Sequence, residues 1–431
     1  MTRRPAGTLP SGLQRVLSGG LILCAIISVL FVGRFSPLPM TMLLDAWIIL
    51  FIGAVLLRGR ILTLLPLSLV AIYAYTRVMG VWVTDVPWDD FVQAYRWLLY
   101  LVAMGVAVGQ HWTRRGALTT LTWWLVSLAT VKAALTWVVH GPGERPGLFL
   151  ENNFELALFS GLTAVVHRGS PRSRLWLLLL LGVLTVLSGS RSGAVAYVLC
   201  FLYAMLSTRT RDVFLRMVAL AVPMLVAVIP VVIFQERAAE SEVIDRVRFF
   251  DVFLRETQDW GPVNWLVGTL PMTPMSPATC EELAYYEALF SSAEDGTCYS
   301  VILHAFALRV VFDAGALGVV LILALPWIFL RRAGVSALLA ATLMAIAVTN
   351  SVSVSGFNNP YVVLPFLLAI LTSSRASAGE SEGEPTGTKP WAPPSTRTAR
   401  RRGPASPRPA RSARTEPRRT PAVVVSGDGE R

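Results

Sequence analysis

Residues 39–60 read PMTMLLDAWIILFIGAVLLRGR, an apolar run that ends in two closely spaced arginines. Asp45 is the one charged side chain before Arg58, and the run is long enough for an α-helix to cross the hydrocarbon core of a bilayer. Arg58 and Arg60 mark the cytoplasmic end, because basic residues are retained on that side of the membrane. The stretch therefore predicts a transmembrane helix whose C-terminal end faces the cytoplasm.

Similar apolar runs recur along the chain, and about twelve of them approach the 20 residues that a membrane-spanning helix needs. Hydrophobic residues make up 54% of the sequence and charged residues 15%, with a mean hydropathy of +0.57. Soluble domains carry about 25% charged residues, so a soluble enzyme, a disulfide-rich secreted domain and a disordered protein are excluded. We predict an all-α polytopic membrane bundle with spans at residues 17–33, 39–57, 61–80, 91–109, 117–139, 153–166, 174–189, 192–206, 213–234, 314–330, 334–350 and 359–373.

Arginines follow every second predicted span, and the alternate connections carry few basic residues. This alternation predicts a multi-pass protein of the cell membrane with both termini in the cytoplasm. The arginines that carry the prediction are Arg58, Arg60, Arg114, Arg115, Arg168, Arg172, Arg174, Arg209, Arg211, Arg331 and Arg332.

The predicted topology divides the chain into five parts. They are a cytoplasmic N-terminus (1–16), nine transmembrane helices (17–234), a large extracytoplasmic loop (235–303), an interfacial segment with three further spans (304–373) and a disordered basic cytoplasmic tail (374–431). The tail holds 12 basic and 6 acidic residues, so more than half of the net charge of +11 lies there. The charge therefore fits the topology and membrane lipids rather than a nucleic-acid partner.

The large outer loop is acidic, with 12 acidic and 4 basic residues. Residues 240–256 read as an amphipathic helix, and residues 281–290 read as a second short helix. Loops of this length in compact proteins usually have a function. The apolar face predicted for the first helix consists of Val243, Val247, Phe250 and Leu254.

Cys280 and Cys298 flank the second predicted helix on the oxidising side of the membrane. We expect them to form a disulfide, and two free thiols are the alternative. Cys24 and Cys200 lie inside apolar spans.

Charged residues inside predicted spans are expensive in lipid, so they should pair within the bundle or line a path through it. Asp45, Arg77, Arg96 and Lys132 are residues of this kind. Asp313 precedes the tenth span, and we expect it to act as the N-cap of that helix.

Four arginines, Arg145, Arg191, Arg246 and Arg248, lie in outward connections where basic residues are scarce. A guanidinium grips a phosphate through two parallel hydrogen bonds, so several of them together would suit a diphosphate. Each could instead anchor a span at the headgroups or pair with a loop carboxylate.

His304 lies before the tenth span, where a histidine could take a proton from a hydroxyl near neutral pH. A hydrogen-bonded interfacial histidine is the alternative. The sequence has no metal-ligand cluster, phosphate-binding glycine loop or nucleotide fingerprint. We therefore expect neither a metal nor a cofactor, and the activating group must arrive with the substrate.

The topology and four short motifs together resemble the O-antigen ligase and polymerase superfamily of bacterial envelope glycosyltransferases. The motifs are Arg-Pro-Gly-Leu-Phe at 145–149 with Asn152-Asn153, the turn Ser-Arg-Ser-Gly at 190–193, Asp245-Arg246 with Leu266-Val267-Gly268, and His304 before Asp313-Ala314-Gly315. Ala305 and Thr269 depart from the residues usual in that family. The resemblance covers most of residues 17–373.

The resemblance implies a metal-independent enzyme of polysaccharide biosynthesis in the cell envelope. Such an enzyme moves a glycan from a polyprenyl-diphosphate carrier to a hydroxyl of a glycan or glycolipid acceptor at the outer membrane face. His304 would orient or deprotonate that hydroxyl, and Arg191 and Arg246 would clamp the diphosphate. Arg145 and Asn153, with Arg248, would support the donor.

Two other functions stay open from the sequence. A polymerase of the same superfamily would join repeat units on the carrier. A flippase or other transporter of lipid-linked glycans would use charged residues deep in the spans, and Asp45, Arg77, Arg96 and Lys132 are candidates for that role.

Overall fold

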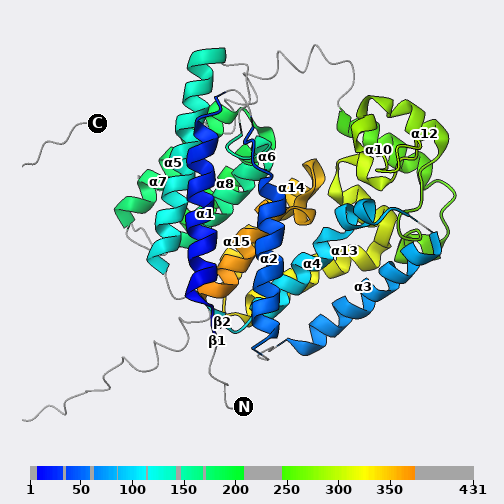
Figure 1. Ribbon diagram of the computed structural model, residues 1–431, viewed down its shortest axis with the longest axis horizontal. Coiled ribbons are helices and arrows are strands. Elements are labelled where there is room, and N and C mark those ends of the chain that lie inside the picture. Colours follow the sequence, from blue (N-terminus) through cyan, green and yellow to red (C-terminus); the bar gives the residue numbers. More distant parts are fainter. Residues whose placement is uncertain are drawn as a thin grey trace, which may run out of the picture. The chain divides into compact units, whose positions relative to one another are not determined.

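The computed structural model describes residues 7–32, 35–58, 63–84, 86–112, 115–141, 147–167, 171–207 and 245–373 (Figure 1). The described part is almost entirely helical, which confirms the predicted all-α class. The α-helices are α1 Ser11–Val29, α2 Met40–Leu56, α3 Leu64–Thr84, α4 Trp88–Ala107, α5 Arg115–His140, α6 Asn152–Val166, α7 Pro171–Ser188, α8 Arg191–Ser207, α10 Asp245–Glu256, α11 Pro262–Val267, α12 Pro277–Glu282, α13 Phe306–Arg332, α14 Ala337–Ser353 and α15 Pro360–Ser373. Shorter elements are β1 Gly7–Thr8, β2 Gln110–His111 and the 3-10 helices η1 Ala284–Leu289, η2 Ser300–Leu303 and η3 Gly356–Asn358.

Four described helices are long and apolar enough to cross a membrane: α1, α3, α13 and residues 116–140 of α5. Five further apolar helices, α2, α8, α14, α15 and residues 175–188 of α7, are shorter. Each predicted span other than 213–234 overlaps one of the helices, and residues 213–234 lie outside the described residues. The number of crossings stays a prediction.

Large apolar side chains are exposed along several of these helices. Ile72 and Val83 on α3 are 62% and 81% exposed, and Val138 on α5 is 83% exposed. Large apolar side chains exposed in such numbers are unfavourable in water. They are what helices in contact with lipid chains present, because lipid does not penalise apolar exposure.

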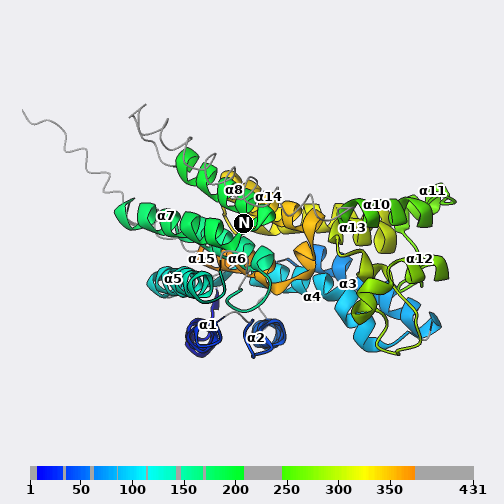
Figure 2. The same cartoon turned by 90° about the horizontal axis from the view of Figure 1, so that it is seen from above.

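Helices α6 and α15 lie at the centre of the bundle. Figure 2 shows them between α1 and α2 on one side and α8 and α14 on the other. Small residues allow this close packing: a Cβ on Gly161 of α6 would lie 2.7 Å from the ring of Pro365 in α15. A Cβ on Gly193 of α8 would lie 2.1 Å from Leu156 of α6. The packing fixes the start of α6 against the start of α8.

Residues 245–303, here called the outer segment, form most of a second hydrophobic core, to which Phe312 of α13 also belongs. The first helix of the outer segment, α10, buries Phe249, Val252 and Phe253. The predicted apolar face was wrong, because Val247, Phe250 and Leu254 are about half exposed. The remaining member, Val243, lies outside the described residues. The sequence of α10 has two apolar faces. The face with Phe249, Val252 and Phe253 packs against η2, and helical periodicity alone selected the other face.

The second predicted helix of the outer segment, 281–290, is present but is divided into the end of α12 and the 3-10 helix η1. The α-helix here is α12, which begins earlier because the Ser276 hydroxyl accepts a hydrogen bond from the Thr279 amide and Pro277 opens the first turn. It ends before Leu283, and the 3-10 helix η1 follows. Cys280 of α12 and Cys298 form a disulfide in this core.

Asp313 is not the N-cap of the tenth predicted span. Helix α13 begins at Phe306, so Asp313 lies in its third turn, where its carboxylate accepts a hydrogen bond from Ser300 Oγ at 2.7 Å. The helix is interrupted two residues later at Gly315, whose φ of +59° is outside the helical region. Sequence hydropathy located the part of α13 from residue 314 onward and missed residues 306–313, which include the charged Arg309 and Asp313.

Gly315 and Gly268 lie back to back where α11 meets α13. A Cβ on Gly268 would lie 2.4 Å from the Ala314 nitrogen, and one on Gly315 would lie 2.6 Å from the Gly268 nitrogen. Arg77 of α3 stabilises the junction, because its guanidinium donates to the carbonyls of Val267, Thr269 and Asp313 at 3.1, 3.2 and 2.8 Å. Arg77 therefore pairs inside the bundle with backbone carbonyls.

We predict that Gly315→Ala destabilises the protein by more than the roughly 1–3 kcal/mol that a strained backbone conformation costs. The added methyl group would also meet backbone atoms of Leu266 and Gly268, which cannot move independently. Thermal unfolding of the purified protein measures the loss. Gly296→Ala is the matched control, because Gly296 has a φ of +79° but no atom within 4 Å of its Cβ position. Equal shifts in the two variants would contradict the packing argument.

Candidate functional site

A cavity of about 300 Å³ opens where the outer segment meets the helices α2, α4, α6 and α13. Its wall combines apolar side chains with polar ones, as small-molecule sites do. The apolar lining residues are Leu150, Phe154, Leu289, Val301 and Val354. The polar lining residues are Thr41, Gln93, Arg96, Glu151, His304, Arg309, Ser355, Asn358 and Asn359.

His304 lies between the cavity and the core of the outer segment. Its ring centroid is 5.8 Å from that of Phe249 and 5.7 Å from that of Tyr286. Its backbone has a φ of +51°, a conformation uncommon outside glycine and enriched at functional sites. The outer segment therefore holds the imidazole in place at the wall of the cavity.

A kink in α4 shapes the opposite wall. Tyr95 has non-helical dihedrals, φ −108° and ψ 15°. The Asn358 amide accepts from the Trp97 nitrogen at 2.9 Å and donates to the Gln93 carbonyl at 2.8 Å. Side chains inserted into the helical hydrogen-bond ladder are a known cause of kinks. This insertion orients the adjoining turn of α4, which carries Arg96, toward the cavity.

Arg96 forms an ion pair with Asp45 of α2, with 3.3 Å between Nη1 and Oδ2. Tyr100 donates a hydrogen bond to the same carboxylate at 2.6 Å. The predicted pairing of these two in-span charges is therefore confirmed. Pairing reduces the cost of both charges, and Arg96 remains part of the cavity wall.

Arg309, which the sequence reasoning missed, also lines the cavity. It is 4% exposed and donates from Nη2 to the Ala94 carbonyl at 3.3 Å, beside the kink of α4. The sequence does contain a signal for Arg309, which lies five residues after His304. The predicted tenth span began after Arg309, whereas α13 begins at Phe306 and includes it. A buried ionisable residue in a helix that is apolar enough to cross a membrane is a functional-site candidate.

The segment before α6 is held by a buried carboxylate. Glu155 of α6 accepts hydrogen bonds from the amides of Leu148, Phe149 and Leu150. Gly147 is required here, because a Cβ would lie 1.5 Å from the Leu150 carbonyl oxygen. These contacts fix the Gly-Leu-Phe part of the motif next to Leu150, which lines the cavity.

Lys132, the remaining in-span charge, belongs to the same buried network. Its ammonium donates to Ser28 Oγ at 2.9 Å, and that hydroxyl donates to the Leu148 carbonyl. An attractive electrostatic interaction links Lys132 with Glu155. This in-span charge therefore stabilises the segment that precedes α6.

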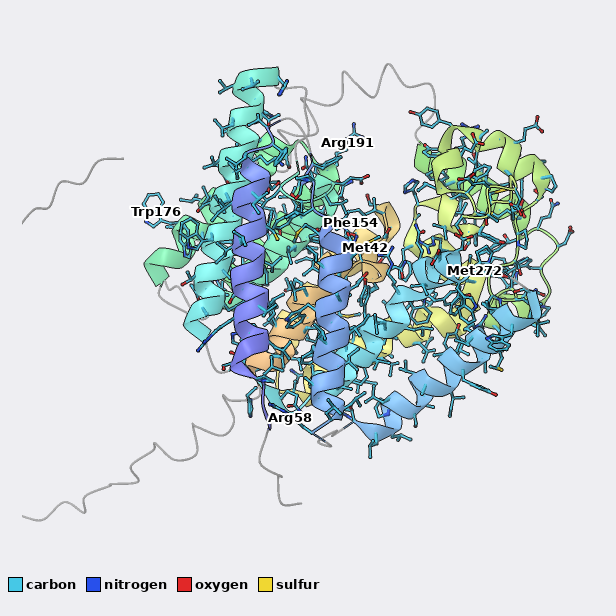
Figure 3. The ribbon with its side chains drawn as sticks, in the orientation of Figure 1. Met42, Arg58, Phe154, Trp176, Arg191 and Met272 are labelled. Carbon is cyan, nitrogen blue, oxygen red and sulfur yellow. A yellow bond between two sulfur atoms is a disulfide. The ribbon has the colours of Figure 1, made fainter. Side chains whose placement is uncertain are left out.

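The structure brings two of the predicted motifs together beside the cavity. The hydroxyls of Ser190 and Ser192 both donate to Asn153 Oδ1, so the turn before α8 is fixed to the start of α6. Arg191 is exposed in this turn and lies at the same end of the bundle as Phe154, which lines the cavity (Figure 3). Neither Arg191 nor Asn153 is among the residues that line the cavity itself.

The predicted arginines of the outer segment differ in what the structure describes. Arg248 pairs with Glu282 at 3.4 Å and donates to its carbonyl, and Arg255 pairs with the same carboxylate. The hydrogen bond from Arg255, supported by Arg248, holds the pKa of Glu282 below its usual range. Arg248 therefore connects α10 to α12. Arg145 and the side chain of Arg246 lie outside the described residues.

Among the described residues, no group of three or more His, Cys, Asp or Glu side chains is arranged to hold a metal ion. Comparison of the sequence with models of known protein families finds no match. Comparison with curated proteins also finds no match.

Proposed function

We propose that this chain is a membrane glycosyltransferase like the O-antigen ligases, which transfers a glycan from a polyprenyl-diphosphate carrier to an acceptor hydroxyl. The observation that carries the proposal is the cavity, in which His304 lies with Arg96 and Arg309 at the junction between apolar helices and the outer segment. A substrate with a lipid chain and a polar head would need an environment of this mixed kind.

In the proposed reaction the acceptor hydroxyl attacks the anomeric carbon of the donor glycan. The new glycosidic bond forms as the bond between that carbon and the diphosphate oxygen breaks. The hydroxyl proton passes to His304, and the electron pair leaves with the lipid diphosphate. Arg191 and Arg246 stabilise the charge that develops on the diphosphate, and Arg145 and Asn153 support the donor. The ion pair of Arg248 with Glu282 supports a positioning role for α10.

The proposal places the outer segment outside the cell and both termini in the cytoplasm, within a multi-pass protein of the cell membrane. We predict that Ser292→Cys in a Cys24→Ser background reacts with a membrane-impermeant maleimide added to intact cells, because Ser292 is exposed in the outer segment. Ser173→Cys, between Arg172 and Arg174, is the matched position expected inside. It should react only after the cells are lysed. Labelling of position 173 but not of position 292 in intact cells would contradict the topology.

The proposed activity is tested by incubating the purified protein with a polyprenyl-diphosphate-linked glycan and candidate acceptors. A ligase yields a glycosylated acceptor and free carrier. A polymerase yields a longer glycan that is still linked to the carrier. Recovery of intact donor from every incubation, under conditions that keep the protein folded, would contradict glycosyl transfer.

A further inference from the structure

The cavity beside His304 contains two positive charges from different helices. Arg96 comes from α4 and Arg309 from α13, and their electrostatic interaction is repulsive. Among the described lining residues Glu151 is the acidic one, and it is exposed. Two guanidinium groups that share one partly enclosed space favour an anion between them, because the anion relieves their mutual repulsion.

Arg309 is the less neutralised of the two arginines. Arg96 has Asp45 as a direct partner, but within the described residues no carboxylate lies within ion-pair distance of Arg309. Asp313 interacts with Arg309 electrostatically, and its Oδ2 accepts from Ser300. A buried guanidinium without a direct counter-ion is unfavourable unless a ligand supplies the charge.

The hydrogen-bonding geometry indicates the kind of anion. The buried Nε atoms of both arginines have no hydrogen-bond partner in the described part of the chain. A guanidinium whose donors are not all satisfied by the protein can bind phosphate oxygens through two parallel hydrogen bonds. We propose that Arg96 and Arg309 bind a phosphoryl group of a substrate inside the cavity that His304 lines. This deepens the proposed function and rests on it, since the phosphoryl group would lie next to the proposed base.

The site is tested by protection of a cavity thiol. In a Cys24→Ser protein carrying Thr41→Cys, alkylation of the introduced thiol should slow as inorganic pyrophosphate fills the cavity, because Thr41 is part of the lining. Arg309→Lys and Arg96→Lys keep the charge and remove the planar fork, so half-protection should require roughly 10–100 times more pyrophosphate. Arg332→Lys, at the exposed end of α13, is the matched control and should leave the concentration unchanged.

Two further probes distinguish the sources of the phosphoryl group. Protection by farnesyl diphosphate that Arg309→Lys weakens assigns it to the donor, and protection by glycerol 3-phosphate assigns it to an acceptor. If one lysine variant does not accumulate, the other tests the site from a different helix. The same half-protection concentration in the parent protein and in a folded lysine variant would overturn the inference, as would absence of protection by all three probes. Glycosyl transfer is measured separately, so protection without transfer would refute the proposed function and leave the phosphoryl site standing.

Discussion

His304→Ala is expected to lower the rate of glycosyl transfer by roughly 10²–10⁴, because the acceptor hydroxyl would lose the group that takes its proton. The loss should become smaller as the pH rises, since a more basic solution removes the proton with less assistance. Initial rates of the purified variants, measured across a pH series with a lipid-linked donor, test both statements.

The backbone at His304 requires a second variant. His304 has a positive φ, so alanine could also change the local structure. Asparagine tolerates this conformation and cannot act as the base, so His304→Asn should lose as much activity as His304→Ala while it keeps the fold. His140→Ala, at the exposed end of α5, is the control and should retain full activity. Unchanged turnover in His304→Asn would leave the reaction without its proposed base.

Arg191→Lys and Arg246→Lys should each lower the transfer rate by roughly 10²–10³. A lysine keeps the charge but loses the planar fork that fits the diphosphate oxygens, and one preorganised stabiliser of developing charge has an effect of this size. Arg145→Lys should have a milder effect because its proposed role is supportive. The variants must still insert in the membrane and accumulate, which gel filtration of the purified proteins checks.

The Arg191→Lys variant tests the guanidinium of Arg191 and leaves the fold of the turn unchanged. The turn that carries Arg191 is fixed by the hydrogen bonds of Ser190 and Ser192 to Asn153, and the exposed guanidinium is not needed for those contacts. The exposed Arg332→Lys is the control and should be neutral. Near-normal transfer by both Arg191→Lys and Arg246→Lys would remove the diphosphate clamp from the mechanism.

The helices of the bundle could be predicted from the sequence because each is a local apolar run. The ends of the described helices agree within about six residues except in α13, where the charged Arg309 and Asp313 precede Gly315 and hydropathy alone begins the helix too late. In α10 periodicity identified a helix but selected Val247 and Leu254 as the buried face. Which of two apolar stripes is buried depends on the partner surface, and that information is not local.

The candidate site could be predicted only in part for the same reason. His304 was selected from its chemistry and position, and it does line the cavity. Arg96 also lines the cavity, because Asn358 kinks α4. Arg309 lines it because α13 begins at Phe306, before Asp313. Both depend on contacts between segments far apart in the sequence. The motifs also do not show why glycine is needed at their positions. The structure does, because Gly268 and Gly315 pack closely against each other and leave no room for a Cβ atom.

The proposed transfer is tested most directly by following the carrier and the glycan together in proteoliposomes that contain the purified protein. The carrier is labelled in its lipid and the glycan in its sugar. We predict that free polyprenyl diphosphate appears only when an acceptor is present, in an amount equal to the glycosylated or elongated product, and that His304→Asn abolishes both signals together. Movement of intact donor across the bilayer without acceptor, and without release of free carrier, would instead identify a transporter and contradict the proposed function.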